Sequence, residues 1–458
     1  MGAPCGGGEP VYQDYYLMHP DRSMPDRWEE SLPEVFPDFA PGNFTWVPEC
    51  EQWVWTTFHD YQWDLNYANP HVFAEMLNIV LHLANQGVEV VRLDAVAFLG
   101  KRLGTSCQNQ PEVHLILQAL RALTRAVAPG VILLAEAIVS PDDLVPYLGR
   151  GEGTGKECEL AYHNVLMVSL WSALAEGSSR LLAHTVAAMP AIPAQASWLT
   201  YARLHDDIGW AITDENAAAV GLDGFAHRAF LSDFYSGAFP GSFARGLVFQ
   251  ENPLTRDRRI SGSMASLCGL ESALETGDEH AVDLAVRRIL LLHHLVLTFG
   301  GLPLVYMGDE IGLLNDDGYA DDPEHADDNR WVHRPVMDWA AAERRHDDGA
   351  PAGRIFTTLQ RLVALRRQTP ALHAQTASTV VPVGDDAVFG LLRHGPRGRV
   401  LVLANVRAEE RRVSLHGTTH LDELGLGPYH LHDLVTGEGL DWDLPLGPYQ
   451  VRWLVARG

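Results

Sequence analysis

The order of apolar and polar positions changes at about residue 69, where a helical period begins. Asn69 can cap a helix, Pro70 suits its first turn and Gly87 suits its end, so the stretch between them is expected to be helical. A short apolar strand follows at once, and the same order recurs further along the chain. Strands are expected over 88–93, 131–135 and 302–307, after helices over 70–86, 112–127 and 280–298, with a weak strand over 161–167. This alternation predicts a parallel sheet covered by helices on both faces.

The pattern also divides the chain into three parts. Residues 1–68 have little periodicity and are expected to form an irregular inserted subdomain. Residues 69–375 are expected to form an α/β (β/α)₈ TIM-type barrel with a long insertion at about 207–270, too long for an ordinary barrel loop and therefore expected at the substrate pocket. After a helix over 354–367, residues 376–458 alternate between apolar and polar positions, which predicts a carboxyl-terminal antiparallel β-sandwich.

Four apolar runs each end in acidic residues. They are VEVVRLD ending at Asp94, VILLAE ending at Glu136, LTYARLHDD ending at Asp206 and Asp207, and LPLVYMGDE ending at Asp309 and Glu310. One such acid would more often cap the next helix than belong to a site. Because the active site of a parallel barrel lies at the carboxyl ends of its strands, four in order favour a shared carboxylate pocket.

The net negative charge of the chain excludes some classes of binding partner. The chain has 34 basic and 59 acidic residues and a net charge of −25. Nucleic acids and anionic membranes require a positive patch, so neither is expected as a partner, whereas a neutral sugar is compatible with this surface. Because the amino terminus lacks a basic and an apolar signal region and the five cysteines are scattered, we expect a cytoplasmic protein with reduced thiols.

Paired carboxyl groups suggest glycosidic chemistry. A retaining enzyme needs two of them about 5 Å apart, one to attack the anomeric carbon and one to protonate the leaving oxygen. Arg92 would keep Asp94 ionised as the nucleophile, and the apolar surroundings of Glu136 would raise its pKa, as a general acid requires. Since His205 and Asp206 could also be metal ligands, metal-dependent hydrolysis is an alternative, but the sequence offers no convincing further ligands.

Aromatic side chains that could pack on sugar rings cluster near these motifs. Trp53 and Trp55 are expected in the core, whereas Phe58 and Trp210, which flank polar motif residues, are the better candidates for the pocket.

Several blocks resemble the conserved segments of the α-amylase family, glycoside hydrolase family 13. The blocks are QWDLN (62–66), VRLDAV (91–96), LLAEAI (133–138) and RLHDDIGW (203–210). Within that family the sequence is most similar to those of the amylosucrases, in the segments FPDFAPG, WDLNYANP, KRLGTSCQNQPE, SGSFARGLVFQENP, RRISGS and DDNRWVHRP. The resemblance runs from about residue 12 to the end and is weakest over the last eighty residues.

The resemblance implies a role for each matched residue. Asp94 would be the nucleophile, Glu136 the general acid/base and Asp206 the third carboxylate, which stabilises the transition state. Substrate would be bound by Arg92, His205, Asp207, Arg259, Arg330, Phe58, Gln62, Ile138 and Gln250. Among these, Asp207 and Arg259 would hold the fructosyl half of sucrose. No cofactor and no metal are implied.

The implied reaction takes glucose from sucrose, transfers it to an α-1,4-glucan and releases fructose. Two alternatives remain open, a sucrose hydrolase or α-glucosidase and a catalytically silent glucan-binding fragment. The sequence departs from the family because only about five barrel strands can be assigned, corresponding to strands 4 to 8. The first three strands and the helical amino-terminal domain of the amylosucrases have no counterpart, so we expect an amino-terminally truncated chain of low activity.

Overall fold

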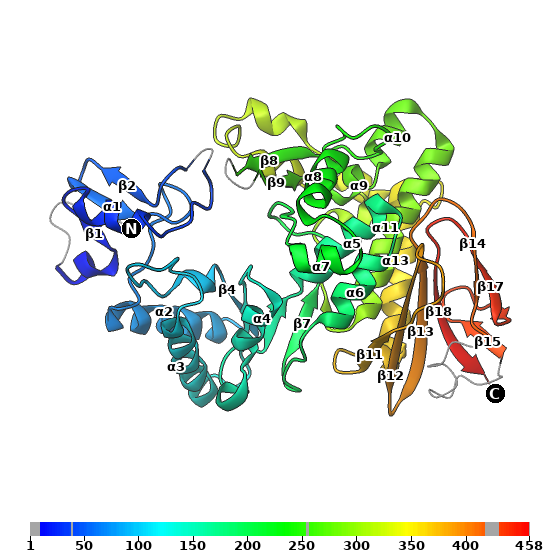
Figure 1. Ribbon diagram of the computed structural model, residues 1–458, viewed down its shortest axis with the longest axis horizontal. Coiled ribbons are helices and arrows are strands. Elements are labelled where there is room, and N and C mark those ends of the chain that lie inside the picture. Colours follow the sequence, from blue (N-terminus) through cyan, green and yellow to red (C-terminus); the bar gives the residue numbers. More distant parts are fainter. Residues whose placement is uncertain (1–9, 38–39, 253–255, 417–429, 458) are drawn as a thin grey trace. The chain divides into compact units, whose positions relative to one another are not determined.

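A computed structural model describes residues 10–37, 40–252, 256–416 and 430–457 (Figure 1). By its internal contacts the chain divides into two compact units. The amino-terminal unit comprises Met1–Tyr162 and Pro190–Ser197, and the carboxyl-terminal unit comprises His163–Met189 and Trp198–Gly458. In the described part of the chain no helix is long and apolar enough to cross a membrane.

The amino-terminal unit begins with a small antiparallel sheet and one helix. Its strands lie in the order β1 (Met18–His19), β3 (Gln52–Trp55) and β2 (Phe44–Val47), and α1 spans Ser23–Glu29. Phe44 and Trp55 pack against each other with ring centroids 5.0 Å apart, and Trp28 of α1 meets Trp55 edge-on at 4.9 Å. The expected core position of Trp55 is confirmed, since its exposed fraction is 1%.

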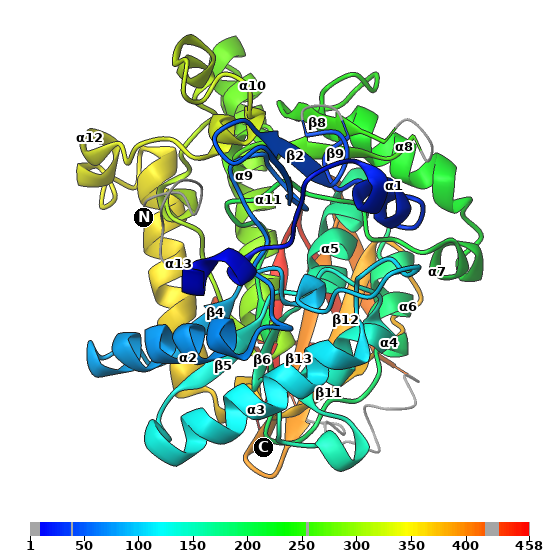
Figure 2. The same cartoon turned by 90° about the vertical axis from the view of Figure 1, so that its left-hand side faces the viewer.

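Alternating helices and strands follow. The elements are α2 (Pro70–Asn85), β4 (Val90–Leu93), α3 (Pro111–Val127), β5 (Ile132–Ala135), α4 (Pro141–Leu144) and β6 (Leu160–Tyr162). The strands β4, β5 and β6 pair in parallel, and α2 and α3 pack against each other (Figure 2). The Asn69 side chain accepts the amide hydrogen of His71, so the expected cap of α2 is confirmed.

The carboxyl-terminal unit also contains parallel strands and long helices. β7 (Ser197–Thr200) pairs in parallel with β10 (Leu302–Pro303), at Leu199 opposite Leu302. The main helices are α5 (Asn164–Glu176), α6 (Arg180–Ala188), α11 (Glu279–Phe299) and α13 (Pro351–Gln368). The weak strand expected over 161–167 is wrong beyond residue 162, because buried apolar residues there form the start of α5, capped by the His163 side chain.

The long insertion is a folded segment of this unit. It contains α7 (Asp214–Ala219), α8 (Gly224–Tyr235), an antiparallel hairpin of β8 (Leu247–Glu251) and β9 (Arg258–Ser261), and α9 (Met264–Leu267), and α10 (Leu270–Thr276) follows it. The rings of Trp210 and Tyr235 stack with centroids 5.6 Å apart.

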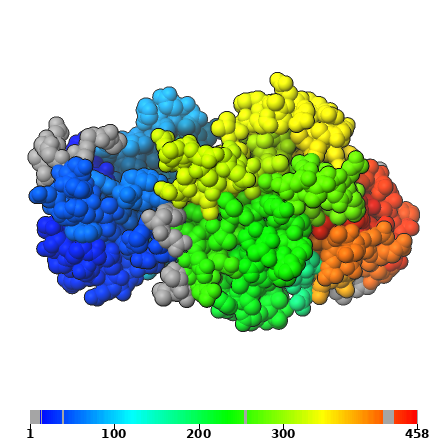
Figure 3. Space-filling view, turned by 90° about the horizontal axis from the view of Figure 1, so that it is seen from above, coloured from blue at the N-terminus to red at the C-terminus, as the bar shows by residue number. Residues whose placement is uncertain are grey.

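The last part of the chain forms an antiparallel sheet, as expected. Six strands lie in the order β11 (Ala377–Val380), β12 (Val388–Gly395), β13 (Gly398–Asn405), β18 (Val451–Arg457), β15 (His430–Asp433) and β16 (Gly439–Leu440), and β14 (Arg411–Ser414) pairs with β17 (Asp443–Leu446). A shared core of Leu392, Leu401, Val413 and Leu444 joins the two sheets. These strands, orange to red, gather in one block in the space-filling view (Figure 3).

The cysteines differ in state. Cys50 is disulfide-bonded, which corrects the expectation that every thiol is reduced. Cys107, Cys158 and Cys268 are buried free thiols.

Candidate active site

Asp94 and Glu136 follow the ends of neighbouring strands in the amino-terminal unit. Leu93 of β4 lies opposite Ala135 of β5, and the amide of Glu136 donates to the carbonyl oxygen of Leu93 at 3.0 Å. The chain then turns sharply at Ala95, which has a φ of +46°, and the Ala95 amide donates to Glu136 Oε2 at 2.7 Å. The backbone after one strand thus binds the carboxylate that follows the other.

Arg92 forms an ion pair with Asp94, as the sequence predicts. The Asp94 side chain is 71% exposed, which leaves it accessible, whereas that of Arg92 is 28% exposed. Burial opposes the charge of Arg92, but the nearby carboxylates of Asp94 and Glu136 outweigh it and raise the Arg92 pKa. Glu136 is partly buried between the buried residues Ala135 and Ala137. Its raised pKa stays a prediction.

The other candidates of this unit differ in exposure. Phe58 is partly buried and meets Phe98 edge-on, with centroids 5.5 Å apart. Gln62 is exposed, and Ile138 is 62% exposed.

Sequence reasoning missed the residue that holds this loop. The Asp64 carboxylate accepts the Thr57 amide hydrogen at 2.9 Å and the Thr57 hydroxyl at 2.6 Å, and it forms an ion pair with Lys101. Both charged side chains are largely buried, at 13% and 8% exposed. The acid in the QWDLN block therefore anchors the loop that carries Phe58 and Gln62.

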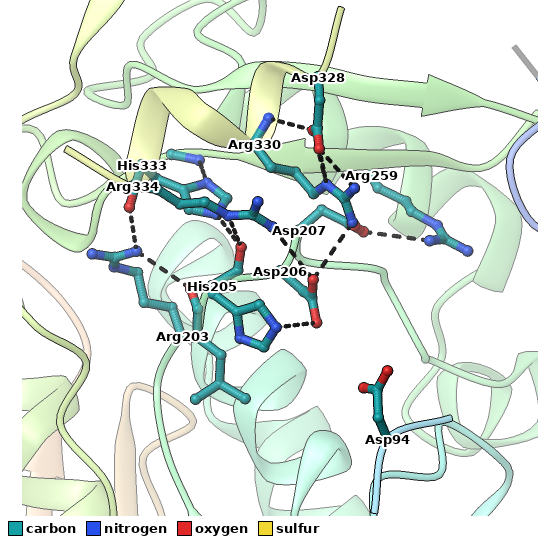
Figure 4. A network of polar contacts seen from close by, with 12 residues as sticks. Asp94, Arg203, His205, Asp206, Asp207, Arg259, Asp328, Arg330, His333 and Arg334 are labelled. Carbon is teal, nitrogen blue, oxygen red and sulfur yellow. Dashed lines mark hydrogen bonds and ion pairs between the residues drawn. The ribbon is translucent and has the colours of Figure 1, made fainter. Parts of the chain in front are cut away.

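In the carboxyl-terminal unit, Asp206 lies close to two arginines and a histidine (Figure 4). Its carboxylate lies 3.2 Å from His205 Nε2, 3.5 Å from Arg330 Nη1 and 3.6 Å from Arg334 Nη2. The side chain is still 37% exposed, so a ligand can reach it. Among the described residues, no group of three or more His, Cys, Asp or Glu side chains could hold a metal ion.

Asp207 and Arg330 each form a further ion pair near Asp206. Asp207 is 7% exposed and its Oδ2 lies 3.6 Å from Nη1 of Arg259. Burial raises the pKa of Asp207, and the Arg259 guanidinium opposes that rise. Arg330 binds Asp328 through Nε at 2.8 Å and Nη2 at 2.7 Å, an acidic partner that sequence reasoning missed. Asp328 lies two residues before Arg330, in the DDNRWVHRP block.

Gln250 occupies an unusual position in the β8–β9 hairpin. A bulge lies between Phe249 and Glu251, and Gln250 takes a φ of +62°, which side chains other than glycine rarely adopt. Its side chain is 8% exposed, and neither amide atom has a hydrogen-bond partner among the described residues. Buried polar groups are normally paired, so an amide without a partner among the described residues is unusual.

Two further candidates are structural. Asp309, at the end of the fourth acidic run, is 2% exposed and accepts a hydrogen bond from Nε of the equally buried Arg203 at 2.8 Å. Trp210, expected at the pocket, is 7% exposed and donates to the Ser232 hydroxyl at 3.0 Å. These buried contacts favour a structural role for both side chains, and a local sequence pattern does not reveal how deeply a side chain is buried.

Comparisons with known proteins point to one family. Residues 6–192 match the alpha amylase catalytic domain. Trehalose synthase/amylase TreS of Mycolicibacterium smegmatis is 31% identical over 303 residues, covering 66% of this chain and 44% of that protein. Glucosylglycerate phosphorylase of Escherichia coli is 25% identical over 454 residues, covering 97% of this chain and 73% of that protein. The chain spans less than half the length of its trehalose synthase relative.

Solved structures share the fold. The crystal structure of sucrose 6F-phosphate phosphorylase from Thermoanaerobacter thermosaccharolyticum superposes with a TM-score of 0.64 at 18% identity, covering 96% of this chain and 79% of that one. The trehalulose synthase MutB from Pseudomonas mesoacidophila gives a TM-score of 0.63 at 16% identity, covering 97% of this chain and 79% of that one. The solved structures show that the chain shares their fold. The match of residues 6–192 to the alpha amylase catalytic domain assigns that part of the chain to the alpha-amylase family, glycoside hydrolase family 13.

Proposed function

We propose that this chain carries the site of a retaining glucosyltransferase that takes glucose from sucrose and adds it to an α-1,4-glucan. The observation that carries the proposal is the pair of carboxyl groups on adjacent strand ends, Asp94 with its arginine and Glu136 with the Ala95 amide. A retaining mechanism requires two such groups with different tasks.

Asp94 attacks the anomeric carbon of the glucosyl ring while Glu136 protonates the fructosyl oxygen, so fructose leaves and a glucosyl ester forms on Asp94. Glu136 then removes the proton of the acceptor hydroxyl, which attacks the same carbon and releases Asp94. Asp206 stabilises the positive charge that develops on the ring in both steps. The contacts of Asp206 with Arg330 and Arg334 support this role, since they hold its carboxylate in one place.

The choice of sucrose rests on the amylosucrase-like blocks. Asp207 and Arg259, which the resemblance assigns to the fructosyl half, form an ion pair, and Gln250 adds an amide that has no hydrogen-bond partner in the described part of the chain. Fructosyl hydroxyls are hydrogen-bonding groups that such residues can bind.

A second candidate is phosphorolysis, in which inorganic phosphate takes the glucosyl group. It is favoured by the similarity to glucosylglycerate phosphorylase, which extends over 97% of this chain.

A single assay separates these reactions. The purified chain is incubated with sucrose in buffer alone, with maltoheptaose, or with phosphate, and fructose, glucose, longer glucans and glucose 1-phosphate are measured. We expect fructose release matched by glucan growth. Free glucose would indicate a hydrolase, and glucose 1-phosphate a phosphorylase.

Trapping tests the mechanism itself. After exposure to 5-fluoro-α-glucosyl fluoride, mass spectrometry should find a glucosyl group on the peptide that contains Asp94, and Asp94→Asn should abolish it. No fructose in any arm and no labelled peptide would exclude the proposed function and leave the silent glucan-binding fragment.

A further inference from the structure

His333 bridges two segments that carry candidate site residues. It lies in the DDNRWVHRP block, but the sequence predicts no role for it. It lies at the end of the short helix Asn329–His333 and is 1% exposed. Its Nδ1 lies 3.0 Å from the amide nitrogen of Gly262, which directly follows β9, the strand of Arg259. Its Nε2 lies 3.0 Å from the carbonyl oxygen of His205.

The two partners fix the position of the proton on the ring. A backbone amide can only donate, so Nδ1 of His333 accepts, and a carbonyl oxygen can only accept, so Nε2 donates. The imidazole is therefore neutral, with its proton on Nε2. Burial, together with the positive charge of Arg203 and Arg334, lowers the His333 pKa to about 3, and the ring stays neutral at any ordinary pH.

The carbonyl of His205 receives a second donor from the same segment. Nε of Arg334 donates to it at 2.7 Å, and Arg203 in turn donates to the His333 carbonyl at 3.2 Å (Figure 4). The carbonyl carbon of His205 is bonded to the backbone nitrogen of Asp206. Two donors on that oxygen fix the plane of this peptide group and, with it, the positions of the nitrogen and Cα of Asp206, from which its side chain departs.

We propose that His333 is a positioning residue, a neutral bridge between Gly262 and His205 that sets the place of the Asp206 carboxylate without touching substrate. The inference rests on the proposed function, because Asp206 acts there on the transition state. Displacing a charged group by about 1 Å can lower a rate by about 100-fold. The loss should therefore fall on kcat rather than on KM.

Three variants test the bridge. His333→Phe keeps a flat ring but removes both hydrogen bonds, and His333→Gln keeps one acceptor and one donor. The control is His294→Phe, at another buried histidine, whose ring packs edge-on against Trp453 at 5.5 Å. We expect His333→Phe to lower kcat by about 10- to 100-fold with KM within about threefold, His333→Gln to recover most of the loss, and His294→Phe to stay close to the unmodified chain.

Two further readouts do not depend on turnover. Deoxynojirimycin, a cationic glucose-shaped inhibitor, should bind His333→Phe about tenfold more weakly than the unmodified chain or His333→Gln by calorimetry. In the unmodified chain, ¹⁵N NMR should find the His333 proton on Nε2. A proton on Nδ1, equal losses in His333→Phe and His294→Phe, or no recovery in His333→Gln would overturn the inference. An unmodified chain that releases no fructose would overturn the proposed function instead.

Discussion

Asp94 and Glu136 follow the ends of two adjacent strands but have different surroundings. The Asp94 carboxylate is exposed and forms an ion pair with Arg92. Glu136 has buried neighbours on both sides and one amide donor. This asymmetry is what separates a nucleophile from a proton donor in glycosidases.

Replacing Glu136 by Gln tests that assignment. The amide cannot protonate a leaving group, so turnover of sucrose should fall by about 100- to 10,000-fold. α-Glucosyl fluoride needs no proton to depart, so formation of the glucosyl-enzyme from it should be largely preserved. The two rates are compared by fluoride and fructose release, with the exposed Glu30→Gln as control. Equal losses on both donors would contradict the role of Glu136 as the acid.

At the scale of elements, the joint between α11 and β10 has no room for a side chain. Gly301 has a φ of +96°, and a Cβ there would lie 2.3 Å from the carbonyl oxygen of Trp198. The neighbouring residues form the parallel pair Leu302 and Leu199. Only glycine allows the chain to leave the helix and enter the strand at this distance.

Gly301→Ala is therefore expected to lower the free energy of unfolding by about 3 kcal/mol, from strained backbone and overpacking together. Gly221→Ala is the matched control, since Gly221 has a φ of +79° but open space around its Cα. Gly221→Ala should lower the free energy of unfolding by only about 1 kcal/mol. Urea unfolding measures both, and similar losses would show that crowding at Trp198 is unimportant.

Elements with local signals could be predicted from the sequence, whereas the links between them could not. The cap, the proline and the apolar face of α2 lie within one stretch, and the acids after β4 and β5 follow apolar runs directly. His333 contacts residues 71 and 128 positions away, at Gly262 and His205. No periodicity marks such a contact, because it arises only when distant segments pack together.

For the carboxyl-terminal unit as a whole, five buried histidines make the free energy of unfolding sensitive to acid. Burial lowers the pKa of His163, His294 and His333 to about 3 and that of His293 to about 4, and it also lowers the pKa of His227. In the unfolded chain their pKa values return to about 6.5, so below this pH the unfolded chain binds protons that the folded chain does not. Stability is therefore complete above pH 6.5 and falls as the pH drops toward 4.

The free energy of unfolding is expected to fall steeply as the pH drops, because each such histidine contributes up to about 1.4 kcal/mol per pH unit. Burial raises the pKa of Asp309 to about 6 and also raises the pKa values of Asp207, Glu176 and Glu271, which acts in the opposite sense and offsets part of this fall. Urea unfolding at pH 7.5, 6.5 and 5.5 should show a loss of several kcal/mol over the last step. His294→Phe should reduce the slope by about one proton, and a stability that is flat down to pH 5 would contradict the neutral state of these rings.

The bulge at Gln250 lowers the stability of the folded protein but places an amide that a ligand could bind. A left-handed backbone at a non-glycine residue costs about 1–2 kcal/mol, and a buried amide without a partner costs about 1–3 kcal/mol more. A bound ligand that forms hydrogen bonds with the amide would remove the cost of the missing partner. The protein without ligand is therefore less stable by that amount than the protein with ligand. Selection for heat resistance alone would therefore favour glycine at this position and remove the side chain that we propose binds the substrate.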